Sequence, residues 1–261
     1  MEDSPQRHAD AVRERFQRAL LASMAFVVGL GAVFFAGPWL GDTRAWSLVP
    51  QSWPGLVGVI TAPLLHGSAG HWLGNAGSLL ILGTLVGTVY PRAALRALPL
   101  IWILSGVGTW LIGRPSFHIG ASGVTHGLLF LLLFLGLLRR DRAAIAAALI
   151  AFFFYGGMVL TVLPREAGVS WEYHFSGAVA GIVAAFIWRR ADPQPPRQRY
   201  SWEDEDDSAD PLDDADVLEP PRPHDVPVLW HRQDPPTAVV LPFRPRTGRD
   251  RDATGGTTPP P

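Results

Sequence analysis

The 261-residue sequence lacks cysteine and lysine, and charged residues make up only 17% of it. The absence of cysteine excludes disulfide bonds, iron–sulfur clusters and zinc sites or nucleophiles built on cysteine. Soluble domains carry about 25% charged residues, so this chain has too little charge for an ordinary soluble protein. The net charge of -1 also provides no basic surface, and we therefore expect no nucleic-acid partner.

Hydrophobic residues are abundant instead, at 48% of the chain, and the mean hydropathy is +0.17. A helix needs about 20 apolar residues to cross a bilayer. Six segments reach or approach that length: 19–41, 72–90, 97–113, 121–138, 143–163 and 172–188. The sequence therefore predicts an all-α, multi-pass membrane protein with six transmembrane helices. A shorter apolar run, 54–65, is expected to lie in a partly inserted loop, with Trp46 and Trp53 at the membrane interface.

The arginines predict how these helices are oriented, because arginines in short loops stay on the cytoplasmic side. They cluster before the first predicted span, between the second and third, between the fourth and fifth, and after the sixth. The opposite loops hold only Arg44, Arg114 and Arg165. We therefore expect both termini in the cytoplasm and the loop 42–71 outside, in a bacterial plasma membrane.

Composition divides the chain into three parts. Residues 1–18 are expected to form a basic cytoplasmic segment, and residues 19–190 the membrane domain. Residues 191–261 are rich in proline and contain the acidic run 203–207. Such a composition cannot build a packed core, so we expect a disordered cytoplasmic tail. A docking role for short apolar stretches of this tail is the alternative.

Strongly polar side chains inside a membrane are costly and are therefore functional candidates. His71 and Asn75 lie in the first turns of the second predicted span, Ser122 opens the fourth, and His174 opens the sixth. All three spans enter the membrane from outside in the predicted topology. We therefore expect these side chains to meet at a similar shallow depth below the outer surface.

These residue types suit nucleophilic catalysis. A serine hydroxyl becomes a nucleophile when a neighbouring imidazole can take its proton. Ser122 lies at a predicted helix start, where free backbone N–H groups and the helix dipole would stabilise an oxyanion. His71 and Asn75 are four residues apart on one helical face, and both can donate hydrogen bonds to the same oxyanion.

Glycines predict close packing of the two helices that carry the serine and the histidine. Gly177 and Gly181 lie on one face of the sixth predicted span, and Gly123 and Gly127 lie on one face of the fourth. Small residues let membrane helices approach closely. Such an approach is what a contact of about 3 Å between the hydroxyl and the imidazole requires.

Two alternatives concern the base. His126, four residues after the serine, could itself accept the proton, but the two side chains would point roughly parallel, which favours His174 with His126 stacked beside it. No acid is placed to orient the base, because Glu166 and Glu172 are expected to be solvated loop acids. His118 is expected to be an exposed loop residue. The sequence therefore predicts a Ser–His dyad and not a triad.

In chain order the motifs are His66-x-Ser68-x-x-His71-x-x-x-Asn75, Gly120-x-Ser122-Gly123 and His174-x-x-Gly177-x-x-x-Gly181. Together, over residues 19–190, they resemble the rhomboid intramembrane serine proteases. His66 and Ser68 match positions that help to hold the polar cavity in that family.

The resemblance implies a six-helix bundle with Ser122 as the nucleophile and His174 as the general base. It also implies an oxyanion hole formed by His71, Asn75 and the backbone amide of Ser122. The implied substrates are transmembrane segments of other membrane proteins within the lipid bilayer. No metal or organic cofactor is implied.

The sequence departs from the family pattern in four places. Val57-Gly58 stands where Trp-Arg is often found, and Gly87 stands near the position of a frequent glutamate. His126 replaces a Tyr or Phe that stacks on the catalytic histidine, and Tyr173 stands where small residues are common. These departures leave open a catalytically silent relative that binds transmembrane helices. A transporter is disfavoured, because the polar residues do not continue to the other membrane face and we find no inverted repeat.

Overall fold

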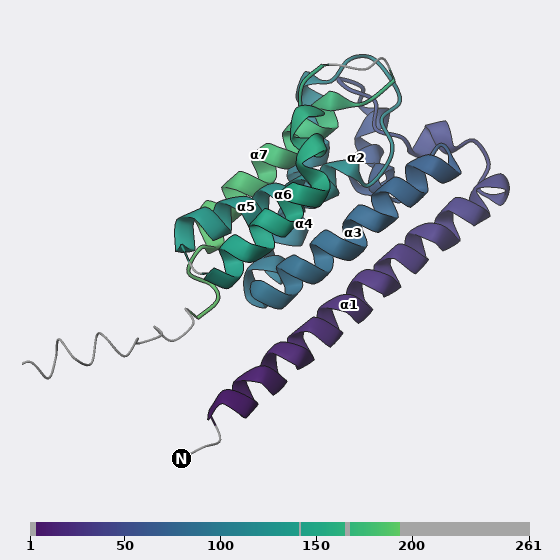
Figure 1. Cartoon of the computed structure of the whole chain (residues 1–261). Coiled ribbons are helices and arrows are strands. Elements are labelled where there is room, and N and C mark those ends of the chain that lie inside the picture. The colour runs from purple at the N-terminus through teal and green to yellow at the C-terminus, as the bar shows by residue number, and fades with distance from the viewer. Residues whose placement is uncertain (1–3, 141, 165–167, 194–261) are drawn as a thin grey trace, which may run out of the picture. The chain divides into compact units, whose positions relative to one another are not determined.

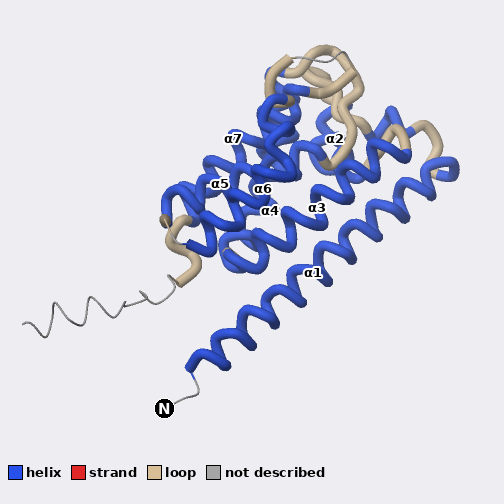
Figure 2. Tube along the Cα trace, viewed as in Figure 1, coloured by secondary structure: helices blue, strands red, loops and turns tan. Residues whose placement is uncertain are grey.

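The computed structural model describes residues 4–140, 142–164 and 168–193. Within these ranges the regular elements are helices, and one isolated antiparallel bridge joins Leu48 and His118. The long helices are α1 (Ser4–Ala36), α3 (Ala69–Val89), α4 (Pro91–Ile112), α5 (Ser122–Arg139), α6 (Arg142–Leu160) and α7 (Trp171–Trp188). Figures 1 and 2 show these helices side by side. The predicted all-α fold class is confirmed.

The outside of the bundle is apolar and parts of its inside are polar. Leu21, Val28 and Phe153 are between 65% and 83% exposed, whereas Ser105 and Thr109 are completely buried. Exposed apolar surface of this extent is what a protein surrounded by lipid presents. The helices α1, α3, α4 and α5 are long and apolar enough to cross a membrane. The protein is therefore an integral membrane protein, while membrane crossing by α6 and α7 stays a prediction.

Two helices, α1 and α4, begin more than five residues before their predicted starts. α1 starts at Ser4, so the basic segment before residue 19 continues the same helix. α4 starts at Pro91, directly after α3, because proline is well suited to the first helical position. The predicted loop before residue 97 is therefore wrong, and Arg92 and Arg96 lie in α4.

The packed structure continues past residue 190, where the membrane domain was predicted to end. Asp192 is only 6% exposed, and its carboxylate accepts hydrogen bonds from the backbone N–H groups of Arg92 (2.9 Å) and Ala93 (3.0 Å). This carboxylate caps the N-terminus of α4 and ties the end of α7 to it. Residues 194–261, where the disordered tail is predicted, lie outside the described residues.

The loop between α1 and α3 is built from short helical turns: η1 (Gly37–Trp39), η2 (Thr43–Trp46), η3 (Pro54–Val57), α2 (Gly58–Thr61) and η4 (Ala62–Leu64). The indole N–H groups of Trp102 and Trp110 in α4 donate to carbonyl groups of this loop, at 3.2 and 2.9 Å. Gly58 packs directly on the backbone of Leu48, where any side chain would collide. This loop conformation therefore requires glycine at position 58. That position is one of those that depart from the family pattern.

α5 lies at the centre of the helices and packs against α3, α4, α6 and α7, while α1 packs against α3 (Figure 1). Leu129, Leu131, Leu132 and Leu135 of α5 have no exposed surface. The first turns of α3, α5 and α7 meet at one end of this bundle. This end carries the candidate site.

Candidate active site

Ser122 is the first residue of α5 and is partly exposed. Gly120, just before it, has a φ of +108°, which glycine adopts more easily than other residues. The Gly120 N–H donates to the carbonyl of Ala62 at 2.8 Å, which fixes the turn to the outer loop. The N–H groups of the first turn of α5 lack helical partners, so they can bind an anion beside the serine.

His71 and Asn75 lie against the same turn. A Cβ atom placed on Gly120 would lie 2.5 Å from Cε1 and Nε2 of His71 and 3.6 Å from the amide nitrogen of Asn75. Asn75 is buried, and its amide donates one hydrogen bond to the His71 carbonyl at 3.1 Å. An amide carries two N–H hydrogens, so one remains for another acceptor. The structure thus brings both proposed oxyanion donors to the start of α5.

Ser68 and His66 support the position of His71. The Ser68 hydroxyl accepts a hydrogen bond from the His71 backbone N–H at 3.1 Å and caps α3. The His66 ring meets the His71 ring edge-on, with centroids 5.1 Å apart. Burial, together with the neighbouring His71, lowers the pKa of His66 to about 4. His66 is therefore neutral at neutral pH and packs against His71 without placing a positive charge there.

His174 reaches the site from α7 and stacks on His126 of α5, with centroids 4.0 Å apart and ring planes 12° apart. Nδ1 of His174 lies 3.1 Å from the carbonyl oxygen of Thr161. A carbonyl can only accept, so in this hydrogen bond Nδ1 carries the hydrogen and Nε2 of the neutral ring keeps its lone pair. This tautomer is the one that a base acting through Nε2 needs.

The ring nitrogens of His126 have other partners. Nδ1 lies 2.7 Å from the carbonyl oxygen of Ser122, and Nε2 lies 2.9 Å from Oγ1 of Thr161 and 3.2 Å from the carbonyl oxygen of Met158. Among the described residues, neither His126 nor His174 makes a hydrogen bond to the hydroxyl of Ser122. Catalytic hydrogen bonds are often long before substrate binds. Within the described residues, Nε2 of His174 has no hydrogen-bond partner in the protein.

The helices α5 and α7 touch through their glycines. A Cβ atom on Gly177 would collide with the carbonyl group of Gly123, and one on Gly181 would collide with that of Gly127. The two backbones are therefore in direct contact, with no room for side chains between them. This close approach holds the histidines of α5 and α7 at stacking distance.

We expect Gly177→Ala to destabilise the protein, although alanine favours a helix. The new methyl group meets rigid backbone, and overpacking of this kind costs about 1–3 kcal/mol or more. Gly74→Ala is the matched control, because a Cβ atom there has no neighbour within 4 Å. It should be neutral or stabilise by up to about 1 kcal/mol. Thermal unfolding in detergent measures both, and equal effects of the two substitutions would contradict the contact.

Two departures from the family pattern have a packing reason. Tyr173 is fully buried, and its ring lies 2.9 Å from the place that a Cβ atom of Gly123 would occupy. The large ring at 173 therefore fits because position 123 is glycine. A Cβ atom on Gly87 would lie 2.8 Å from Cβ of Ala19 in α1, so a glutamate at position 87 would collide with that helix.

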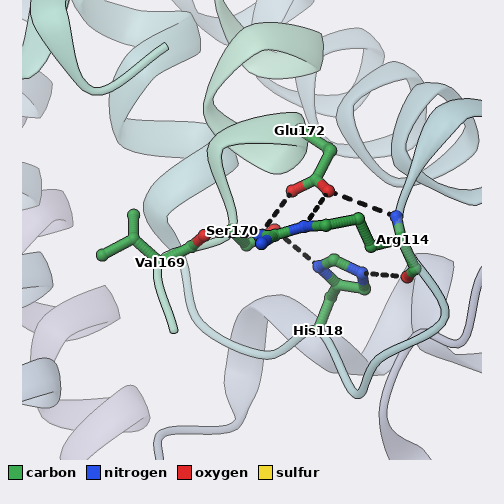
Figure 3. Close-up of polar contacts among 5 residues, drawn as sticks. All are labelled: Arg114, His118, Val169, Ser170 and Glu172. Carbon is green, nitrogen blue, oxygen red and sulfur yellow. Dashed lines mark hydrogen bonds and ion pairs between the residues drawn. The ribbon is translucent and has the colours of Figure 1, made fainter. Parts of the chain in front are cut away.

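An ion pair between Glu172 and Arg114, whose side chain is 49% exposed, was not predicted from the sequence (Figure 3). Glu172, in the first turn of α7, has no exposed surface, and its carboxylate binds the guanidinium of Arg114 with an Nε–Oε1 distance of 2.5 Å. Arg114 also donates to the carbonyl of Val169 at 2.8 Å. The hydrogen bond to Glu172 raises the pKa of Arg114 above its usual value. The pair fastens the loop after α4 to the start of α7.

The expectation that Glu172 and His118 are solvated loop residues was wrong. His118 is only 3% exposed; its Nδ1 lies 2.5 Å from Oγ of Ser170, and its Nε2 lies 3.1 Å from the carbonyl oxygen of Arg114. One signal in the sequence could have indicated the burial of Glu172: it is an acid in the first turn of a predicted membrane helix. A charge that is buried there needs a partner. Glu166 lies outside the described residues.

We expect Glu172→Gln to lower the thermal stability, because it removes the charge of a buried carboxylate that pairs with the half-exposed Arg114. The control is Glu14→Gln. Glu14 forms an ion pair with Arg18, and the two side chains are 63% and 76% exposed. Exposed pairs contribute about 0–1 kcal/mol, so this control should unfold almost like the wild type. Melting curves of the two variants in the same detergent compare them directly. Wild-type stability in Glu172→Gln would contradict a structural role for the pair.

The Rhomboid domain family matches residues 53–191, which is just over half of the chain. An uncharacterized protein of Mycobacterium tuberculosis (strain ATCC 25618 / H37Rv) is 45% identical over 147 residues, covering 53% of this chain and 61% of that protein. One from Mycobacterium bovis aligns equally well, and one from Mycobacterium leprae is 38% identical over 141 residues, covering 51% of this chain and 56% of its own length. The chain thus spans about three-fifths of the length of these relatives.

The chain belongs to the Rhomboid family. A rhomboid domain with apolar helices is that of an integral membrane protein, and the family is one of intramembrane proteases.

Proposed function

We propose that this protein is an intramembrane serine endopeptidase that hydrolyses peptide bonds in or near transmembrane segments of other membrane proteins. The observation that carries the proposal is the meeting of three helix starts at one end of the bundle. α3 contributes His71 and Asn75, α5 contributes Ser122, and α7 contributes His174. Membership of the Rhomboid family supports the same reaction.

In the proposed acylation step, Nε2 of His174 takes the hydroxyl proton while Oγ of Ser122 attacks the carbonyl carbon of the scissile bond. The Thr161 carbonyl accepts the Nδ1 hydrogen of His174, so it orients the ring and stabilises the imidazolium that forms. His71, Asn75 and the Ser122 N–H would donate to the oxyanion. His174 then gives its proton to the leaving amine, and an acyl ester remains on the serine.

In the proposed second step, water attacks this ester while His174 again acts as base. The acid product leaves, and the hydroxyl of Ser122 is restored. The mechanism is that of a dyad, because the carboxylate of Glu172 is bound to Arg114 and supports α7 instead of the imidazole. The proposal includes no metal or organic cofactor.

For the membrane setting, we propose six spanning helices, with α6 and α7 as the fifth and sixth, in a bacterial plasma membrane. Both termini would be cytoplasmic, and the site would lie just below the outer surface. The distribution of arginines supports this orientation, since they gather at the helix ends away from Ser122.

The test is cleavage of a single-span reporter protein by the purified full chain in liposomes. The reporter carries small, helix-destabilising residues near the outer end of its span. We expect two fragments whose junction lies in or beside that span. A reporter that binds to the protein and stays intact would contradict the proposal and would indicate the catalytically silent, helix-binding relative instead.

A further inference from the structure

A cavity of about 580 Å³ lies between α1, α3 and α4, at the end of the bundle away from the candidate active site. Its walls run along α1 from Arg15 to Phe26 and along α3 from Leu79 to Gly87. The first turns of α4 close a further side, and the three helices are labelled in Figure 1. Most of the lining is apolar, including Phe26 and Val86. Nothing in the proposed proteolysis uses this cavity.

The charge at its mouth is positive. Arg15, Arg18 and Arg92 line the cavity there. Arg18 pairs with Glu14 at 2.8 Å, whereas no ion pair of the Arg15 or Arg92 side chain occurs within the part of the chain that the structure describes. Asp192 is the acid in the lining, but both its carboxylate oxygens accept from backbone N–H groups at the start of α4. Among the described residues, the side chains of Arg15 and Arg92 are therefore available to bind an anion.

The depth of the cavity fits one leaflet of a membrane. Eleven residue steps separate Arg15 from Phe26, which is about 16 Å along a helix at about 1.5 Å per residue. The hydrocarbon core of a bilayer is about 30 Å thick, so one leaflet is about 15 Å. The arginine-rich helix ends are those predicted to face the cytoplasm, where the leaflet carries anionic lipids.

We propose that this cavity binds an anionic phospholipid, with its phosphate group at Arg15 and Arg92 and an acyl chain between α1 and α4. A free phosphate ion would use the arginines but not the apolar walls. A helix of another protein would use the walls but not the arginines. A phospholipid uses both, and its binding is independent of proteolytic activity.

The experiment titrates the purified full chain in detergent with phosphatidylglycerol and, separately, with phosphatidylcholine, and measures bound lipid by native mass spectrometry. The test variant is Arg15→Gln/Arg92→Gln. The matched control is Arg13→Gln/Arg96→Gln, which removes the same charge from α1 and α4 at exposed residues that do not line the cavity. We expect the test variant to lose about tenfold or more in phosphatidylglycerol affinity and the control to lose little.

A second variant tests the apolar part without changing charge. Ala22→Phe places a ring at the cavity wall on α1, and we expect it to weaken phosphatidylglycerol binding although all arginines remain. Equal affinity for the two lipids would overturn the proposal. So would equal losses in the test and control pairs, which would indicate attraction by overall charge. Competition by inorganic phosphate at the lipid concentration would indicate an ion site instead.

Discussion

We expect Ser122→Ala to lower reporter cleavage by at least about 10³-fold, since removing the nucleophile of a serine protease has effects of this size or larger. Folding and membrane insertion should be unchanged, because Ser122 is partly exposed and loses only its hydroxyl group. Cleavage of the single-span reporter in liposomes measures the rate. Melting temperature and extraction from membranes measure folding and insertion.

Ser176→Ala is the matched control for this substitution. Ser176 is a second serine near the site, in α7, and its buried hydroxyl has no hydrogen-bond partner in the described structure. Its removal should leave cleavage close to the wild-type rate. Retained cleavage in Ser122→Ala would show that another group is the nucleophile.

We expect His174→Ala to lose as much activity as Ser122→Ala, and His126→Phe to keep a substantial part of it. Nδ1 of His174 lies on the Thr161 carbonyl, and Nε2, which has no partner in the described part of the chain, is the nitrogen proposed to act as base. His126 contributes a ring face to the stack, and phenylalanine supplies a similar face. Reporter cleavage by the two variants, measured side by side, separates the two roles.

A double variant adds a sharper test of the dyad. If Ser122 and His174 act as one unit, Ser122→Ala/His174→Ala should be no slower than either single variant, because residues of a catalytic unit are not additive. Activity lost in His126→Phe as completely as in His174→Ala would make His126 the base.

Much of the fold follows from hydropathy along the chain. The predicted spans 72–90 and 121–138 differ by a few residues at most from α3 (Ala69–Val89) and α5 (Ser122–Arg139). Apolar length alone fixes such central helices. The starts of α1 and α4 were not predictable in this way. In both helices, polar residues extend the helix on the N-terminal side of the apolar run. Pro91 allows α4 to begin directly after α3.

The meeting of the polar residues could also be predicted, because alternate helices of a bundle begin at the same end. His71, Ser122 and His174 were placed together on that ground. The partner of the His174 Nδ1 could not be predicted, since it is the backbone carbonyl of Thr161 and a carbonyl has no sequence signature. The role of Asp192 as a helix cap could not be predicted either, because its partners lie about 100 residues earlier in the chain.

The ion pair of Arg114 and Glu172 shows a different limit of prediction from the sequence. The two residues are 58 positions apart, and each taken alone has the features of an exposed loop residue. The burial of Glu172 depends on how the loop after α4 folds over the start of α7, while its partner Arg114 stays 49% exposed. Charge in a predicted outer loop is therefore a weak indication of exposure when the loop packs on a helix end.

The central claim is that Ser122 is activated by its surroundings, and covalent labelling measures this most directly. The wild-type full chain in liposomes is treated with a fluorophosphonate probe, and the modified residue is identified by mass spectrometry. We predict one adduct, on Ser122, that is absent in Ser122→Ala and forms far more slowly in His174→Ala. An adduct on another serine, or an unlabelled, well-folded wild type beside an active rhomboid protease that labels, would contradict the claim.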